Sequence, residues 1–248
     1  MTKLQKLHSD HGQSPWLDNL RRDWLLDGTL QSWIGRGVRG VTSNPTIFQK
    51  AMSQGTAYDE QFTELLRSGM SVPDAYWAMV VSDVEDTRAV FRPVHEASGG
   101  EDGFVSLELA PEQARDTAAS IEAARRFHEQ IAEPNLYVKI PATAEGTPAV
   151  EAMVAEGRNI NITLIFSLER YADVMEAYLS GLEACDGDLS SVRSVASFFV
   201  SRVDTEVDRR LEAIGSDEAL ALRGKAAVAQ AKLAYRDFRR TFSGSRWE

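Results

Sequence analysis

Short apolar runs typical of β-strands recur along this chain, and stretches with helical periodicity lie between them. Strands are expected near residues 14–18, 38–42, 103–108, 135–140, 161–166 and 193–199. Helices are expected over residues 57–68, 72–91, 111–132, 145–157, 168–184, 202–214 and 217–242. Such an alternation is typical of repeated βα units, whose strands pair in parallel. The sequence therefore predicts an α/β fold built on a parallel sheet.

The strand ends indicate a TIM-type (β/α)8 barrel, because polar residues stand at several of them and barrel active sites lie at that face. The length of 248 residues also agrees with a barrel of roughly 250. However, a long insertion separates the second and third strands, and no strand is expected after residue 199. We therefore expect a single (β/α)-barrel domain over residues 1–248, truncated after about six βα units and C-terminally incomplete.

The composition excludes some classes of partner. Charged residues make up 26% of the chain and the formal net charge is -10, which argues against nucleic acid bound by a general basic surface. A sugar phosphate is not excluded, since it needs only one or two well-placed arginines. The histidines lack metal-ligand spacing, and no GxGxxG or P-loop motif is present. We therefore expect no metal site and no nucleotide site.

Cysteine content and hydropathy point to a compartment. Cys185 is the only cysteine, so no internal disulfide can form and a reducing environment is expected. No apolar run reaches the roughly 20 residues of a membrane span. The first residues, MTKLQKLHSDHG, lack the apolar region of a secretory signal. We expect a cytoplasmic protein with no membrane partner; the sequence leaves its oligomeric state open.

A lysine in the strand at 135–140 is the strongest candidate for chemistry. Apolar residues at 136, 138 and 140 alternate with Tyr137 and Lys139, the period-two pattern of a strand. Burial disfavours the charged form of a lysine, and a neutral amine can form a Schiff base with a carbonyl. The next strand has polar residues at Asn161 and Thr163. If the two strands are neighbours, an amine, an amide and a hydroxyl meet at one end. The alternative is an ordinary lysine at a half-exposed strand end.

Several motifs together resemble the transaldolase family. They are WLDN at 16–19, GVTSNPTIF at 40–48, SLEL at 106–109, VKIPAT at 138–143, NINITLIFS at 159–167 and SFFVSR at 197–202. These motifs occur in the family's order and cover nearly the whole chain, and they look most like its longer bacterial subgroup. The resemblance implies a Schiff-base transferase of the pentose phosphate pathway. Such an enzyme moves a dihydroxyacetone unit from sedoheptulose 7-phosphate to glyceraldehyde 3-phosphate, giving erythrose 4-phosphate and fructose 6-phosphate. It needs no cofactor, because the lysine supplies the electron sink.

The resemblance also implies catalytic roles. Lys139 would attack the C2 carbonyl of the ketose phosphate, and Asp18 would take the C4 hydroxyl proton. Glu108 would move protons through a water that the Thr163 hydroxyl holds. Each residue has a plainer alternative: Asp18 as the N-cap of a helix over residues 19–26, Glu108 as a solvated strand-end charge, and Thr163 as an ordinary strand residue.

Four further residues would bind substrate. Asn44 would donate to substrate hydroxyls, although Asn-Pro is also a common turn. Asn161 and Ser197 would position the ligand. Arg202 would bind the phosphate with its guanidinium, the alternative being a surface ion pair with Asp204 or Glu206. No second phosphate-binding arginine can be assigned in 203–248.

Two other functions remain open at this stage. One is a lyase similar to fructose-6-phosphate aldolase, which would release dihydroxyacetone instead of transferring it. The other is a catalytically impaired fragment without an enzymatic role, favoured by the expected lack of two further βα units that follow a similar Trp-Glu in the subgroup.

Overall fold

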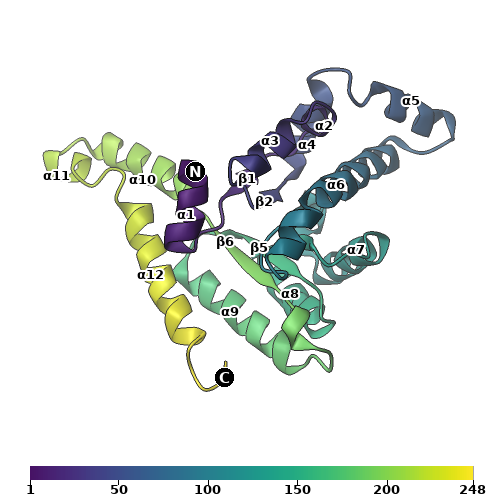
Figure 1. Ribbon diagram of the computed structural model, residues 1–248. Helices are drawn as coiled ribbons and strands as arrows, with labels where there is room; N and C mark the ends of the chain where they lie inside the picture. The colour runs from purple at the N-terminus through teal and green to yellow at the C-terminus, as the bar shows by residue number, and fades with distance from the viewer. Residues whose placement is uncertain (248) are drawn as a thin grey trace. The chain divides into compact units, whose positions relative to one another are not determined.

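The computed structural model describes residues 1–247 and contains one six-stranded sheet (Figure 1). The strands are β1 (Trp16–Asp18), β2 (Gly40–Thr42), β3 (Val105–Glu108), β4 (Leu136–Pro141), β5 (Ile160–Ile165) and β6 (Ser194–Phe198). The order in the sheet follows the chain, β1-β2-β3-β4-β5-β6. β1 pairs with β2, β2 with β3, and β5 with β6 in parallel. A strand order that never reverses is that of a (β/α) barrel rather than of a doubly wound sheet, which confirms the predicted fold class.

Helices precede, separate and follow the strands. They are α1 (Lys3–His11), α2 (Arg22–Leu26), α3 (Thr29–Gly35), α4 (Pro45–Ser53), α5 (Asp59–Arg67), α6 (Val72–Ala97), α7 (Thr117–Gln130), α8 (Gly146–Ala155), α9 (Leu168–Glu183), α10 (Ser201–Ile214), α11 (Asp217–Leu220) and α12 (Ala226–Thr241). Short 3-10 turns cover Pro111–Arg115 and Leu189–Ser191. Thus 111–132 is a 3-10 turn followed by α7, and α6 extends past the predicted end at residue 91.

The single helix predicted over residues 217–242 is wrong, because the chain leaves helical geometry between α11 and α12. Gly224 has a left-handed φ of 68°, which glycine adopts without steric cost. The Gly224 amide donates to the Asp208 carboxylate at 3.0 Å, and the Ala227 amide donates to Asp204 at 2.9 Å. Two acidic side chains of α10 therefore satisfy amides at the start of α12, which no local pattern predicts.

The chain forms two compact units. The first comprises Met1–Pro111 and Arg125–Val138, and the second comprises Glu112–Ala124 and Lys139–Glu248. β4 contributes residues to both: the Val105 amide of β3 donates to the Asn135 carbonyl in the first unit, and the Ala142 amide donates to the Thr163 carbonyl in the second. The expected single domain over residues 1–248 stays a prediction.

Each unit has its own apolar core. In the first, Gly40 of β2 makes room for a ring of β1, because a Cβ at Gly40 would lie 2.3 Å from the Trp16 indole. In the second, α8 packs on α9 and on β5, whose residues Ile160, Ile162 and Ile165 are buried. No helix within residues 1–247 combines the length and the apolar character needed to cross a bilayer.

Candidate active site

An aromatic layer in the first unit fixes which strand faces point toward one another. The Tyr137 ring of β4 stacks on Phe104 at a centroid distance of 4.2 Å and on Trp16 of β1 at 6.1 Å. Side chains alternate along a strand, so residues two apart share a face. Asp18 therefore lies on the same face of β1 as Trp16, and Lys139 lies on the same face of β4 as Tyr137. Within the first unit, Asp18 thus follows the aromatic layer at the carboxyl end of its strand.

Asp18 is an exposed residue that ends β1. The alternative interpretation, in which Asp18 caps the following helix, is wrong, because α2 begins at Arg22 with Arg21 as its N-cap and without any side-chain cap. Glu108 ends β3 and is half-buried, on the face that also bears Phe104. Asp18 and Glu108 therefore both stand at the carboxyl ends of their strands, as the sequence predicted.

Asn44 follows β2 and has a structural role. Its side-chain oxygen accepts the Ile47 amide at 3.0 Å, which caps the N-terminus of α4. The structure thus shows a helix N-cap in place of the Asn-Pro turn weighed as the alternative, and the role of Asn44 toward substrate stays a prediction. Next to it, the buried Ser43 hydroxyl donates to the Ser106 carbonyl at 2.7 Å and ties this turn to β3.

Lys139 is buried in β4, with 5% of its surface exposed. The half-exposed alternative is therefore wrong. In the same unit the neighbouring strand β5 buries Asn161 and Thr163, at 2% and 1% exposure. The hydrogen bond from the Ala142 amide to the Thr163 carbonyl, at 2.7 Å, joins the carboxyl end of β4 to β5. The expected adjacency of the strands that bear the amine, the amide and the hydroxyl is confirmed.

The polar side chains of β5 have different partners. The Asn161 side-chain oxygen accepts from the Ser197 hydroxyl of β6 at 2.7 Å, so the structure brings these two predicted ligand residues together. The Thr163 hydroxyl oxygen is buried and has no hydrogen-bond partner within residues 1–247. Buried hydroxyls nearly always have a partner, so this group is one that a bound molecule can satisfy.

Arg202 lies exposed in the first turn of α10. Its guanidinium stacks on the Phe199 ring at 4.7 Å, and that ring contacts Phe166 at 4.9 Å. The acids offered as its partners are engaged elsewhere: Asp204 accepts the Ala227 amide, and Glu206 binds Arg209 and Arg210. No ion pair of Arg202 occurs among the described residues, so that alternative is wrong. Sequence reasoning missed Phe166 and Phe199, whose signal is an aromatic residue directly after each strand.

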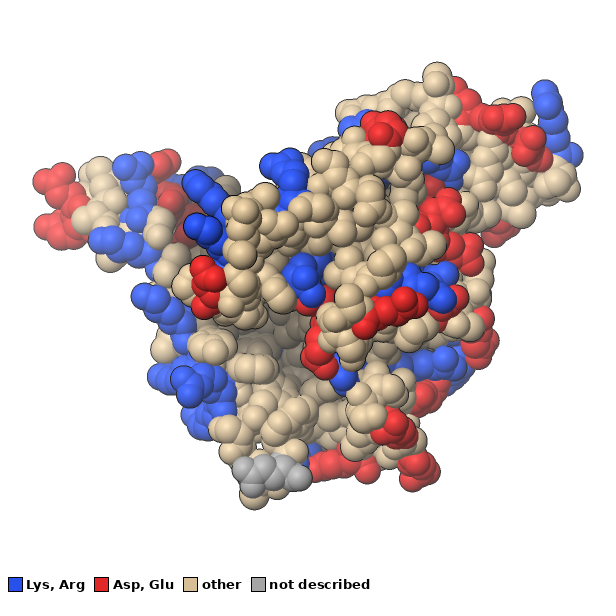
Figure 2. All heavy atoms as spheres, in the orientation of Figure 1, with Lys and Arg blue, Asp and Glu red and all other residues tan. Residues whose placement is uncertain are grey.

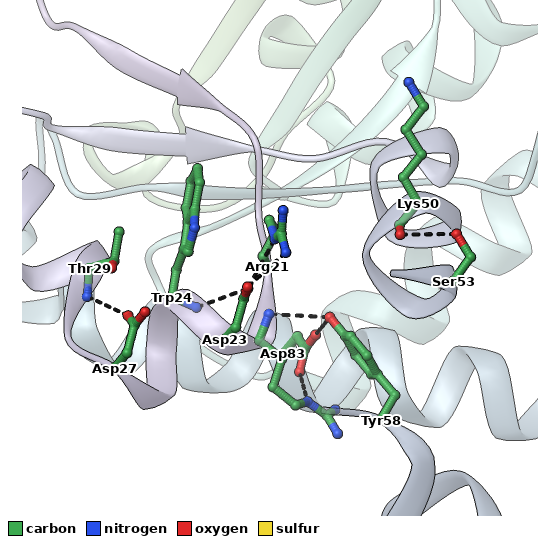
Figure 3. Close-up of polar contacts among 10 residues, drawn as sticks. Arg21, Asp23, Trp24, Asp27, Thr29, Lys50, Ser53, Tyr58 and Asp83 are labelled. Carbon is green, nitrogen blue, oxygen red and sulfur yellow. Dashed lines mark hydrogen bonds and ion pairs between the residues drawn. The ribbon is translucent and has the colours of Figure 1, made fainter. Parts of the chain in front are cut away.

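A buried polar network in the first unit was also missed. The Tyr58 hydroxyl binds the carboxylate of Asp83 in α6 (Figure 3). Arg22 of α2 binds the same carboxylate. Burial raises the pKa of the Asp83 carboxyl and of the Tyr58 hydroxyl above their ordinary values. The network holds α2 close to α6, and α2 follows Asp18 in the chain. The sequence signal of this network is an acid, Asp83, among apolar residues of a predicted helix. The apolar neighbours Met79, Val80 and Val84 are buried in the structure, as Asp83 is.

A group of lysine and arginine side chains lies on α12 (Figure 2). Lys232, Arg236, Arg239 and Arg240, with Tyr235 and Ser243, line an open cavity of about 410 Å³. Asp237 lies within 3.3 Å of Arg236 and of Arg240, which offsets part of this charge. Within the described chain, no three His, Cys, Asp or Glu side chains gather as metal ligands.

The comparisons with known proteins agree with the motifs and the fold. The sequence profile of the transaldolase/fructose-6-phosphate aldolase family matches residues 15–246. The chain belongs to this family. It is 52% identical over 248 residues to "Transaldolase" of Thermobifida fusca, which covers 98% of the chain and 67% of that relative. It is 47% identical over 251 residues to "Transaldolase 2" of Streptomyces coelicolor, covering 100% of the chain and 68% of the relative.

A third relative, "Transaldolase" of Kocuria rhizophila, is 51% identical over 238 residues, which is 94% of this chain and 64% of the relative. The chain therefore spans about two thirds of the length of these relatives. The resemblance inferred from the motifs is confirmed, and membership places the chain among transferases of the transaldolase type. The roles of individual residues stay predictions.

Proposed function

We propose that this chain catalyses the transaldolase reaction on sugar phosphates of the pentose phosphate pathway. It would move a dihydroxyacetone unit from sedoheptulose 7-phosphate to glyceraldehyde 3-phosphate and form erythrose 4-phosphate and fructose 6-phosphate. The observation that supports this most is the burial of Lys139, at 5% exposure, next to a strand whose Thr163 hydroxyl is buried without a partner in the described chain. A lysine amine can form a Schiff base with a carbonyl, and its position beside Asn161 and Thr163 of β5 supports that role here.

The first half-reaction builds the Schiff base. The Lys139 amine attacks the C2 carbonyl of the ketose phosphate, and the resulting carbinolamine loses water to give a protonated imine. Dehydration needs a proton for the departing hydroxyl, which Glu108 supplies through a water molecule. The Thr163 hydroxyl holds that water, and its buried oxygen, which has no partner within residues 1–247, supports this role. Asn161 and Ser197 bind sugar hydroxyls through the polar pair that they form at 2.7 Å.

The second half-reaction breaks and remakes one carbon–carbon bond. Asp18 takes the C4 hydroxyl proton, the C3–C4 bond breaks, and its electron pair moves into the iminium to give an enamine. Erythrose 4-phosphate leaves. The enamine then attacks the aldehyde carbon of glyceraldehyde 3-phosphate, Asp18 returns the proton to the new hydroxyl, and hydrolysis frees fructose 6-phosphate. The exposure of Asp18 and its absence from the α2 cap support this role.

The substrate phosphate is assigned to Arg202 and the sugar hydroxyls also to Asn44. Arg202 is exposed, and stacking on Phe199 orients its planar guanidinium while leaving its N–H donors available. The Asn44 side-chain oxygen is used in the α4 cap, and its amide N–H groups are the donors that it would offer to the sugar hydroxyls. The cytoplasmic location and the independence from a cofactor stay predictions.

The family name also covers a lyase, fructose-6-phosphate aldolase. Transfer is favoured because relatives at 46–52% identity are named transaldolases. The two activities differ in the need for an acceptor. With fructose 6-phosphate alone a transaldolase retains the dihydroxyacetone unit on its lysine, whereas the lyase releases free dihydroxyacetone. Measuring dihydroxyacetone with and without erythrose 4-phosphate separates them.

Chemical trapping tests the proposal. Fructose 6-phosphate and borohydride should reduce the imine to a stable secondary amine, which peptide mass spectrometry should place on Lys139. Lys139→Ala should abolish the adduct, and Lys50→Ala, at an exposed lysine of α4, should leave it unchanged. Asp18→Asn should still give the adduct but lose about 10²–10⁴-fold in turnover, the range of a general acid–base group. An adduct on another lysine, or full turnover by Lys139→Ala, would overturn the assignment.

A further inference from the structure

One leucine in β5 has a backbone conformation that leucine rarely adopts. Leu164 has a φ of 62°, and within residues 1–247 no other residue apart from glycines has a positive φ. In this region the Cβ of an L-residue lies too close to its own backbone, so only glycine, and sometimes asparagine or aspartate, is tolerated routinely. Strained backbone of this kind persists only where the surrounding structure imposes it, and it gathers at functional sites. Leu164 directly follows Thr163.

The strain coincides with a β-bulge. Ile162 of β5 pairs with Ala196 of β6, and Ile165 pairs with Phe198, with a register shift between the two pairs. Three steps along β5, from 162 to 165, therefore match two steps along β6, from 196 to 198. The extra residue belongs to the Thr163–Leu164 pair. A bulge bends its strand and turns a side chain in a new direction, and bulges are common beside active sites.

The bulge changes which side chains share a face. Paired residues of neighbouring strands lie on the same face. Ile162 and Ile165 therefore both lie on the face of Ala196 and Phe198, although three positions separate them. That face is the outer one, since Phe198 contacts Tyr171 of α9 with ring centroids 5.7 Å apart. Thr163 and Leu164 are left together on the opposite face, which also bears Asn161 and Ser197.

A β5 strand without the bulge would place different side chains at its carboxyl end. Without the extra residue, Ile165 would take the next inward position after Thr163 and place an apolar side chain at the carboxyl end of the strand. The Thr163 carbonyl would also turn, yet it now accepts the Ala142 amide at 2.7 Å, one of the contacts between β5 and the end of β4. The bulge thus keeps the Thr163 main chain bonded to the segment after Lys139 and leaves its buried hydroxyl without a partner in the described chain.

We propose that Leu164 is a positioning residue: its left-handed conformation holds β5 in the bulged register that aims the Thr163 hydroxyl at the Schiff-base site. This inference rests on the proposed function of Lys139. It differs from a packing role for the Leu164 side chain, because what matters is the backbone conformation at this position. A residue that accepts the left-handed region should therefore replace leucine, and one that resists it should not.

The test compares substitutions that differ in their backbone preference. Glycine accepts a positive φ at no steric cost, asparagine accepts it better than most residues, and β-branched isoleucine resists it most. The readout is the rate at which borohydride traps the imine of fructose 6-phosphate on Lys139 in the whole chain. The trapping rates of Leu164→Gly and Leu164→Asn should stay within about threefold of that of the unchanged chain. Leu164→Ile should slow trapping by about tenfold or more, which approaches the loss expected when an acid–base group is removed.

Two controls separate positioning from stability. Ile162→Val weakens packing of the same strand, and it should lower the melting temperature without changing the trapping rate. In a Thr163→Val background, Leu164→Ile should have no further effect on trapping, because the hydroxyl that it misplaces is already gone. If Leu164→Ile does not fold, Leu164→Gly decides alone: a tenfold loss there would assign the effect to the leucine side chain and overturn the proposal.

The outcomes also separate this inference from the proposed function. If the unchanged chain forms no adduct on Lys139, both fail. If it forms the adduct and all three Leu164 variants trap at its rate, only the role of Leu164 fails. Retention by the glycine and asparagine variants, together with loss by folded Leu164→Ile, would support both.

Discussion

A substitution at Asp83 should cost this protein several kcal/mol of stability. Its side chain is fully buried, at 0% exposure, in the middle of α6. Nε of Arg22 donates to one carboxylate oxygen at 2.6 Å, and the Tyr58 hydroxyl donates to the other at 2.6 Å. The Tyr58 hydroxyl also accepts the Arg22 amide at 3.2 Å, and the Arg22 guanidinium lies 4.3 Å from the Tyr58 ring centre. All three groups therefore depend on one another (Figure 3).

The expected magnitudes follow from these contacts. Asp83→Ala leaves the Arg22 guanidinium, which is only 13% exposed, without its carboxylate. Removing one partner of a buried ion pair costs about 3–5 kcal/mol of unfolding free energy. Tyr58→Phe removes a hydrogen bond to a carboxylate and should cost about 1.5–3 kcal/mol. Because the two side chains touch, the double variant should cost less than the sum by about 0.5–3 kcal/mol.

The assay is urea unfolding at 25 °C, followed by circular dichroism and tryptophan fluorescence. Asp86→Ala, at an exposed acid one turn along the same helix, is the matched control and should stay within about 0.5 kcal/mol of the unchanged chain. Replacing the whole network with Arg22→Met, Asp83→Leu and Tyr58→Phe should recover most of the loss, since apolar residues can substitute for a complete buried ion pair. A cost of Asp83→Ala below about 1 kcal/mol, or strictly additive effects, would refute the reasoning.

Three other predictions test separate features. Gly40→Ala should lower the melting temperature, because its Cβ would lie 2.3 Å from the Trp16 ring. Adding Trp16→Leu should restore part of the loss, and no such rescue would show that the Trp16 ring is not its cause. Burial raises the pKa of Tyr171 to about 12, so the folded chain holds a proton that the unfolded chain releases near pH 10. The free energy of unfolding should therefore fall between about pH 10 and about pH 12, and it should fall less in Tyr171→Phe. The same loss in both proteins would contradict this assignment. Arg202→Ala should raise KM for fructose 6-phosphate and not for dihydroxyacetone, whereas Arg209→Ala on the same helix should change neither; equal effects on both substrates would indicate a structural role.

Much of the architecture and of the candidate site could be predicted because both depend on local patterns. Short apolar runs located all six strands within two residues of their observed starts and ends. Alternation also placed Lys139 on the second face of its strand, where the structure buries it. The site residues stand at or just after strand ends, and a strand end is a local property of the chain.

The failures share a physical cause, which is that distant groups decided the outcome. The acids Asp204 and Asp208 of α10 bind amides around Gly224, and this divides a segment whose local propensity is helical. The contact of Arg202 with Phe199 was also missed, and the ion pair weighed as the alternative for Arg202 is absent because Asp204 and Glu206 have other partners. Local propensity contains no information about such competition.

The sequence by itself determined the family, the order of strands and helices, and the identity of the polar residues at the strand ends. It could do so because motifs and periodicity are written in consecutive residues. Only the tertiary structure decided the bulge at Leu164, the burial of the Asp83 network and the pairing of Asn161 with Ser197. These features depend on register and packing between segments far apart in the chain, and the strain or desolvation at each is compensated only by contacts that form once the fold is complete.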